Sequence, residues 1–225
     1  MPVLRFPDPR DTTPEGIVAV GGDLHPDTLR LAYGQGIFPW PHDGLPLLWF
    51  CPPERAILDF GRLHVPRRLA RIRRQSRLTF TMDRAFPQVI AACRRAKRPG
   101  QLGTWITPAM ERAYCRLHHE GDAHSVEAWD EAGCLVGGVY GVDAGGAFGG
   151  ESMFHVEPNA SKLALLFLVD HLRARGLDWM DIQMTTPHME ALGAIEVSRH
   201  AFLERLARTR ARSLSLFPTL RPHEE

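Results

Sequence analysis

The sequence has 225 residues, of which 44% are hydrophobic and 24% charged, and its formal net charge is +1. This composition is typical of a globular protein and excludes a disordered chain. No run approaches the roughly twenty apolar residues of a membrane helix. The start, MPVLRFPDPRD, has the layout of neither a secretory signal nor a transit peptide. We therefore expect a cytoplasmic protein with no membrane partner.

Common metal and cofactor motifs are missing from the sequence. His119-Glu120 is followed by His124, one residue too far for an HExxH zinc helix. The phosphate loop, the dinucleotide fingerprint and the nucleophile elbow are also missing. A Cys–His nucleophilic pair stays open, since such partners lie far apart in a chain, but nothing marks one. We expect no metal and no cofactor. The cysteines form no CxxC pair and are Cys51, Cys93, Cys115 and Cys134.

The first sixty residues are rich in glycine, proline and aromatic side chains. One short helix is predicted over residues 26–36, just before the segment Phe38-Pro39-Trp40. We expect a small, loop-rich N-terminal domain over residues 1–61 and a larger domain over residues 62–225.

An arginine-rich helix is predicted over residues 66–75, with Pro66 in its first turn and an apolar stripe at Leu69 and Ile72. No acidic residue lies between Asp59 and Asp83. Such a single-sign cluster suggests a polyanionic partner, although a solvated helix face is the common alternative. The arginines concerned are Arg67, Arg68, Arg71, Arg73 and Arg74.

The remaining pattern alternates helices with strands. After a strand over 77–82, Asp83 is expected to cap a helix over 85–96, and Thr107-Pro108 opens another that Gly121 ends. Residues 124–154 predict about three antiparallel strands, and Asn159 is expected to cap an apolar helix. A strand over 177–184 and a short helix at Thr186-Pro187 follow. This order indicates an α+β fold with a central, mostly antiparallel sheet.

Several short motifs occur together along about residues 16–205: GGDL, FPW, GTWIT, GESMF and Asp-x-Gln. In this order they make the sequence similar to the leucyl/phenylalanyl-tRNA–protein transferase family. The resemblance implies a small N-terminal domain and a larger domain with the acyl-CoA N-acyltransferase fold, to which the acyl group is delivered by tRNA. The stretch EPNASKLALL lacks the pyrophosphate-loop glycines of coenzyme A enzymes, which agrees with delivery of the acyl group by tRNA in place of coenzyme A.

Asp181 and Gln183 are the catalytic residues that the resemblance implies. They lie two apart in a predicted strand, so their side chains are expected on one face. We expect Gln183, which has no useful basicity, to position the attacking amine. Asp181 is expected to polarise Gln183 or to accept the proton through water. Catalysis by the ribose hydroxyl of the terminal adenosine stays open, as does a purely structural role for both residues.

The resemblance also implies a site for the aminoacyl end of the tRNA. Trp40 and Trp105 would sandwich the terminal adenine, where stacking on an aromatic ring contributes roughly 1–3 kcal/mol. Packing in the core is the alternative for each tryptophan. An apolar pocket for the transferred side chain is expected, with the ordinary core as its alternative, and it would be formed by Val139, Phe148, Leu165 and Leu168.

Position 139 is often a bulkier residue in relatives, so Val139 predicts better tolerance of phenylalanine. Glu151 is expected to bind the amino group of the donor or the acceptor, with an arginine ion pair as its alternative. Ser152 and Met153 are expected to shape the same wall, and Thr186 to contribute hydrogen bonds near the catalytic glutamine.

The function that this resemblance implies is transfer of leucine or phenylalanine from aminoacyl-tRNA to the N-terminal amine of an acceptor protein. An aminoacyl ester is already activated, so the transfer needs positioning and proton management only. The expected acceptors begin with Arg or Lys and are marked for degradation, with acidic N-termini, which related transferases accept, as the alternative. The enzyme is expected to be a monomer. The rival hypotheses are a coenzyme A-dependent N-acetyltransferase and a non-enzymatic RNA-binding protein.

Overall fold

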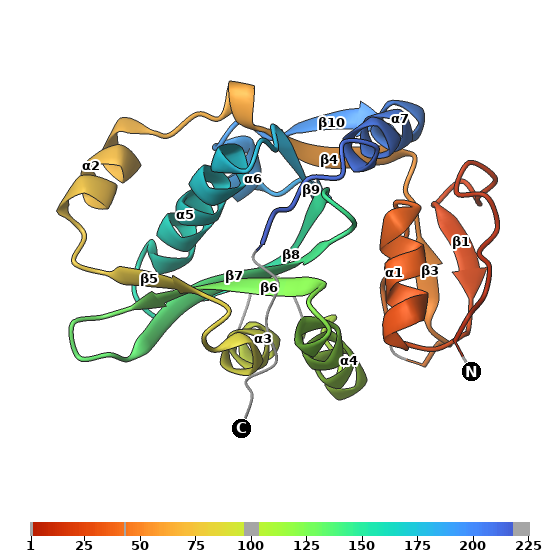
Figure 1. Cartoon of the computed structure of the whole chain (residues 1–225), viewed down its shortest axis with the longest axis horizontal. Helices are drawn as coiled ribbons and strands as arrows, with labels where there is room; N and C mark the ends of the chain where they lie inside the picture. The colour runs from red at the N-terminus through yellow and green to blue at the C-terminus, as the bar shows by residue number, and fades with distance from the viewer. Residues whose placement is uncertain (1, 43, 97–103, 218–225) are drawn as a thin grey trace.

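The structure, a computed structural model, describes residues 2–42, 44–96 and 104–217. Its strands form two sheets, one of three strands and one of seven. Figure 1 shows the small sheet and its helix at one end of the molecule and the large sheet, with helices on both faces, beside it.

The small sheet has the strand order β1-β3-β2, and all of its pairs are antiparallel. The predicted first helix is confirmed as α1, which His25 caps through its ring nitrogen at the backbone N of Asp27. This helix packs its buried Leu29, Ala32 and Tyr33 toward the core. The elements are β1 (Ile17–Val20), α1 (Pro26–Gly34), β2 (Phe38–Pro39) and β3 (Leu48–Phe50).

The large sheet has the order β10-β4-β9-β8-β7-β6-β5. Only the β8–β9 pair is parallel among its described pairs, which confirms the expected α+β fold with a mostly antiparallel sheet. A helix, α5 (Ala160–Ala174), connects the two parallel strands. The strands are β4 (Glu54–Asp59), β5 (Thr79–Met82), β6 (Ala123–Trp129), β7 (Leu135–Asp143), β8 (Phe148–His155), β9 (Trp179–Gln183) and β10 (Ile195–Ser198).

The two faces of this sheet carry different helices, as Figure 1 shows. Alternate residues of β7 point to opposite faces: a Cβ atom on Gly137 would touch Ala160 of α5, whereas the ring of Tyr140 packs edge-on against Phe86 and Tyr114. Those two rings belong to α3 (Phe86–Arg95) and α4 (Pro108–His119). The core of the protein therefore lies on both sides of the sheet.

Helix caps agree with the sequence at some positions and not at others. Thr107 and Thr186 accept hydrogen bonds from the backbone of Met110 and Met189, as predicted. Asp83 does not cap α3, whose N-cap is Ala85 without a side-chain bond. Its carboxylate instead accepts from the backbone N of Ser125 and contacts the His124 ring, so it binds to β6 and not to the start of α3.

Asn159 stands at the N-cap of α5 but makes no capping hydrogen bond through its side chain. Its φ of 71° is left-handed, a conformation that asparagine tolerates better than most residues. The residue therefore turns the chain into the helix through its backbone and not through a side-chain cap.

The C-terminal third contains two elements that the sequence analysis did not predict, β10 and α7 (Arg199–Arg210). The short elements η1 (Phe60–Arg62), α2 (Arg67–Gln75) and α6 (Pro187–Glu190) complete the described chain. Strand β4, which precedes the expected boundary at residues 61 and 62, pairs with β9 and β10 of the large sheet. No helix among the described residues is long and apolar enough to cross a membrane.

Candidate active site

Three predicted residues, Glu151, Asp181 and Gln183, converge where the parallel strands β8 and β9 meet. The two strands share one paired position, Gly149 with Asp181. Irregular registers interrupt the neighbouring ladders β4–β9 and β7–β8 at this level. Such bulges re-aim side chains at a sheet, and here they bring the three polar groups into one buried cluster.

Asp181 is held by an arginine from the neighbouring strand. Arg55 Nε donates to Asp181 Oδ1 at 2.8 Å, and Arg55 Nη2 donates to Oδ2 at 2.6 Å. The arginine is only 1% exposed, and its guanidinium lies 4.6 Å from the ring centre of Phe38 and 4.5 Å from that of Phe202. This bidentate, aromatic-flanked contact fixes the carboxylate in one orientation.

Gln183 connects the two carboxylates of the cluster. Its backbone N donates to Asp181 Oδ1 at 2.9 Å, and its Nε2 donates to Glu151 Oε1 at 2.6 Å. Its φ is 62°, a left-handed value that is uncommon outside glycine and is found at functional sites. The side chain thus reaches the cluster through a turn at the strand end, and not through the simple strand alternation that we predicted.

Glu151 lies between the sheet and two buried tyrosines. Tyr114 of α4 donates to Glu151 Oε2 at 3.3 Å, and the hydroxyls of Tyr114 and Tyr33 share a hydrogen bond. Burial raises the pKa of Glu151 to about 8. The alternative of an arginine ion pair is not realised within the described residues, where Arg55 pairs with Asp181 instead. A buried acid with a neutral-range pKa is typical of a site that handles protons.

Arg55, Tyr33 and Tyr114 contact the predicted residues but are not among the residues predicted from the sequence. Arg55 precedes the apolar run Ala-Ile-Leu in β4, so a charged residue inside a buried strand was the available signal. The tyrosines had no such signal, because a helical tyrosine that faces the core reads as ordinary packing.

The two predicted adenine-stacking tryptophans are partly buried against the core. Trp40 contacts the rings of Phe38, Phe50 and His42, which makes an aromatic surface on the small sheet. Their binding of adenine stays a prediction.

The predicted apolar pocket residues are all buried, with exposed fractions of 2 to 4%. A Cβ atom on Gly141 would touch the Phe148 ring, which places Phe148 on the α5 face of the sheet. Val139 pairs with the half-buried Met153, next to the half-buried Ser152. Thr186 is engaged in capping α6. Contact with substrate stays a prediction for all of these residues, namely Val139, Phe148, Leu165, Leu168, Ser152, Met153 and Thr186.

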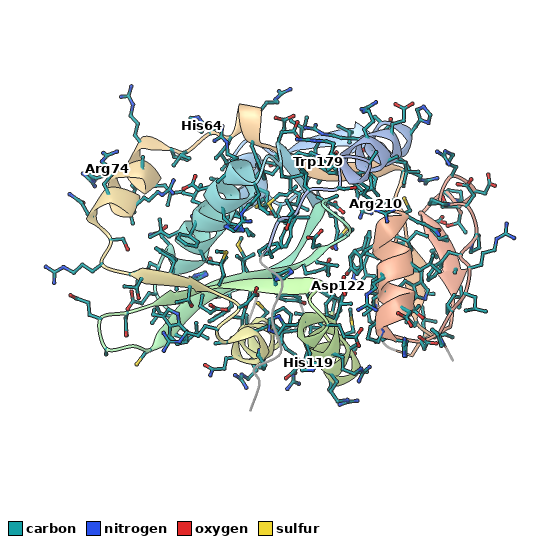
Figure 2. The ribbon with its side chains drawn as sticks, in the orientation of Figure 1. His64, Arg74, His119, Asp122, Trp179 and Arg210 are labelled. Atoms are coloured by element: carbon teal, nitrogen blue, oxygen red, sulfur yellow. The ribbon has the colours of Figure 1, made fainter. Side chains whose placement is uncertain are left out.

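All five arginines of the predicted tRNA-binding helix are exposed on α2. Arg73 contacts Asp170 of α5, whereas the other four have no carboxylate within ion-pair distance in the described part of the chain. Figure 2 shows Arg74 on α2, at the end of the molecule opposite the small sheet.

Two surface pockets lie away from the cluster. One, of about 400 Å³, lies between the N-terminal segment, the end of α1 and α7, with Arg210 and Leu203 in its wall. The other, of about 630 Å³, lies between α3 and the end of β8. None of the predicted site residues lines either pocket. Within the described ranges, no group of three His, Cys, Asp or Glu side chains is placed to hold a metal ion.

The fold and the cluster define an α+β protein with a buried acid–amide centre, an arrangement typical of enzymes. The family described as "Leucyl/phenylalanyl-tRNA protein transferase" matches residues 57–207, and its N-terminal domain matches residues 22–53. The chain therefore belongs to the leucyl/phenylalanyl-tRNA–protein transferase family, a family of aminoacyltransferases, which confirms the resemblance found in the sequence.

Individual relatives agree with this membership. The chain is 51% identical over 201 residues to the leucyl/phenylalanyl-tRNA–protein transferase of Maridesulfovibrio salexigens, covering 89% of this chain and 84% of the relative. It is 50% identical over 214 residues to that of Anaeromyxobacter dehalogenans strain 2CP-C, covering 92% and 91%. Among solved structures, L-PGS from Bacillus licheniformis matches with 16% identity and a TM-score of 0.39, over 72% of this chain and 51% of that one.

Proposed function

We propose that this chain transfers leucine or phenylalanine from an aminoacyl-tRNA to the N-terminal amine of an acceptor protein. The observation that carries the proposal is the buried Glu151–Gln183–Asp181 cluster in a member of an aminoacyltransferase family. The acceptors begin with Arg or Lys and are thereby marked for degradation. The reaction takes place in the cytoplasm, and the enzyme acts as a monomer.

The transfer reaction needs little from the enzyme beyond holding its two substrates in position. The ester between an amino acid and its tRNA is activated, and attack by an amine gives the more stable amide without a nucleotide or a cofactor. Holding two reactants in register lowers a bimolecular barrier substantially. The fixed amide of Gln183 and the carboxylates on either side of it supply directed polar groups for an attacking amine.

The tRNA is held at two places in this proposal. Trp40 and Trp105 stack on the terminal adenine, for which aromatic rings are suited because every base has a π-face. The exposed arginines of α2 neutralise backbone phosphates farther along the acceptor arm. The free guanidinium groups on α2 support this assignment, because four of them have no carboxylate partner in the described chain.

The direct test is transfer of radiolabelled leucine from leucyl-tRNA to peptides that begin with Arg, Lys, Asp or Glu. We expect transfer to the Arg and Lys peptides, and its loss in Asp181→Ala. Transfer to the acidic peptides alone would keep the reaction and overturn the acceptor rule. Binding of charged tRNA without transfer to any peptide would favour an RNA-binding protein over an enzyme.

A further inference from the structure

The two carboxylates of the cluster have unequal surroundings. Both oxygens of Asp181 are bound to the Arg55 guanidinium, and Oδ1 also accepts from the backbone N of Gln183. Three donated hydrogen bonds, two of them from a cation, stabilise the ionised form of this group. Both oxygens of this carboxylate are therefore occupied by donors that hold it in place.

Glu151, in contrast, has only neutral hydrogen-bond partners. Gln183 Nε2 donates to one oxygen at 2.6 Å, and the Tyr114 hydroxyl donates to the other at 3.3 Å. Within the described residues no cation lies within ion-pair distance of it. Only 9% of the residue is exposed. Unlike Asp181, the Glu151 carboxylate therefore has no cation that holds it in the ionised form.

We propose that Glu151 is the proton acceptor of the transfer reaction, and that Arg55 is a positioning residue that keeps Asp181 as a fixed anion behind Gln183. This inference rests on the proposed function. The amine nitrogen attacks the ester carbonyl carbon and forms the N–C bond, and the Glu151 carboxylate takes the surplus proton from that nitrogen. The C–O bond to the ribose then breaks, and Glu151 returns the proton to the leaving ribose oxygen.

The charges around Glu151 suit this exchange. The pKa of Glu151 is raised to about 8, mainly by burial and also by the nearby Asp181, against the opposite effect of Arg55 and of the Tyr33 and Tyr114 hydroxyls. A protein N-terminal amine has a pKa near 8. Proton transfer between groups of similar pKa at the working pH is efficient, so the two reacting groups are matched.

The first test compares Glu151→Gln with Glu127→Gln. Glu127 is also a fully buried carboxyl with a raised pKa, but its partners are Ser125 and Thr81 on β6 and β5. With tRNA and peptide saturating, we expect kcat to fall by about 100-fold or more in Glu151→Gln and to stay within about twofold in Glu127→Gln. A Glu151→Gln enzyme that changed only KM would overturn the inference, because a residue that merely binds an amino group has that effect.

The second test concerns Arg55 and has a readout beyond the rate. Arg55→Lys retains the charge but cannot form the bidentate ion pair, and we expect a fall in kcat of about tenfold with the acid limb of the pH–rate profile kept. In Glu151→Gln the same limb is expected to become less steep, because only the acceptor amine, with its pKa near 8, still titrates there. An unchanged kcat in Arg55→Lys, with folding confirmed by circular dichroism, would contradict the positioning role.

A titration of the Glu151 side chain by carbon NMR separates this inference from the proposed function. We expect the assigned signal, absent in Glu151→Gln, to titrate near pH 8 in the wild type, whether or not transfer occurs. Ionisation at the ordinary pKa of a glutamate would overturn the inference alone. A wild type that titrates as expected but transfers nothing from any aminoacyl-tRNA would instead overturn the proposed function, and with it the proton-acceptor role.

Discussion

Arg55 and Asp181, which lie 126 positions apart in the chain, form a bidentate ion pair between the adjacent strands β4 and β9. The pair links the strand that follows the small sheet to the strand that carries the catalytic residues we predicted. Its arginine also touches Phe38 of the small sheet and Phe202 of α7. One guanidinium therefore contacts three segments that lie far apart in the sequence, and its loss is expected to affect both stability and the geometry of the cluster.

Removing one partner of this pair is expected to destabilise the protein strongly. Arg55→Met leaves the Asp181 carboxylate buried without its cation, which typically costs about 3–5 kcal/mol. Chemical denaturation followed by tryptophan fluorescence measures the change in the free energy of unfolding. Arg77→Met is the control, since its pair with Glu131 is exposed on both sides and such pairs contribute about 0–1 kcal/mol. Equal effects of the two substitutions would show that the buried pair contributes no more to the free energy of unfolding than the exposed pair.

The acid of the cluster predicts a pH dependence of stability. The pKa of Glu151 is raised in the folded state, so folding favours its protonated form, and this contribution is lost as the pH rises from about 4.5 through about 8. Glu151→Gln should remove that part of the dependence, so that the variant gains stability relative to the wild type as the pH increases across this range. Parallel stability curves for the two proteins from pH 5 to 9 would contradict the raised pKa.

The arginines of α2 predict a salt effect on tRNA binding. Replacement of Arg67, Arg68, Arg71 and Arg74 by glutamine should weaken binding and lower the slope of log affinity against log salt by roughly 0.7–0.9 for each phosphate that is no longer neutralised. Binding is measured by filter retention between low and physiological salt. Arg77→Gln serves as the control, because Arg77 lies beyond the helix and pairs with Glu131. A flat salt response of the wild type would remove this surface as a phosphate-binding site.

The stacking role of the tryptophans predicts a selective loss. Trp105→Ala should weaken binding of the aminoacyl end by about 1–3 kcal/mol, seen as a higher KM for charged tRNA with the fold intact. Trp129→Ala is the matched control, since Trp129 donates to Thr81 on the β5 side of the sheet. If both variants raise KM equally, the effect comes from stability and not from stacking.

Val139 predicts a preference that a single substitution tests. One methylene in an apolar pocket changes discrimination by about 1–3 kcal/mol, so the larger side chain in Val139→Met should lower the rate with phenylalanine more than the rate with leucine. Transfer from phenylalanyl-tRNA and leucyl-tRNA is compared in both enzymes. Equal rates with the two amino acids in the wild type and in the variant would count against a pocket at this position.

Local signals in the sequence predicted many of the elements but not how distant segments pair. Thr107-Pro108 and the glycine at 121 fixed the limits of α4 correctly, because caps are short-range chemistry. The placement of β4 between β9 and β10 depends on pairing across more than a hundred residues. No local pattern in residues 54–59 reports such a partner.

The same limit applies to the site. Motifs single out Glu151, Asp181 and Gln183, and hydrogen bonds join the three residues in the structure, whereas their catalytic and binding roles stay predictions. No local pattern predicts the role of Arg55, because its partner is distant in the sequence. The cap prediction for Asp83 is wrong because its carboxylate contacts Ser125, 42 positions away on β6. Helix α7 was missed since arginines interrupt its apolar stripe, although Ser198 caps it in the ordinary way.

The most direct test of the central claim is single-turnover transfer of labelled leucine from leucyl-tRNA to a peptide that begins with arginine, followed in the wild type and in Asp181→Ala. We predict that the wild type forms the leucyl peptide within the time of the assay. Asp181→Ala, under conditions where circular dichroism shows it to be folded and where it binds the same tRNA, is expected to form the peptide far more slowly. Equal rates in the two proteins, or no leucyl peptide from a wild type that binds the charged tRNA, would contradict the account.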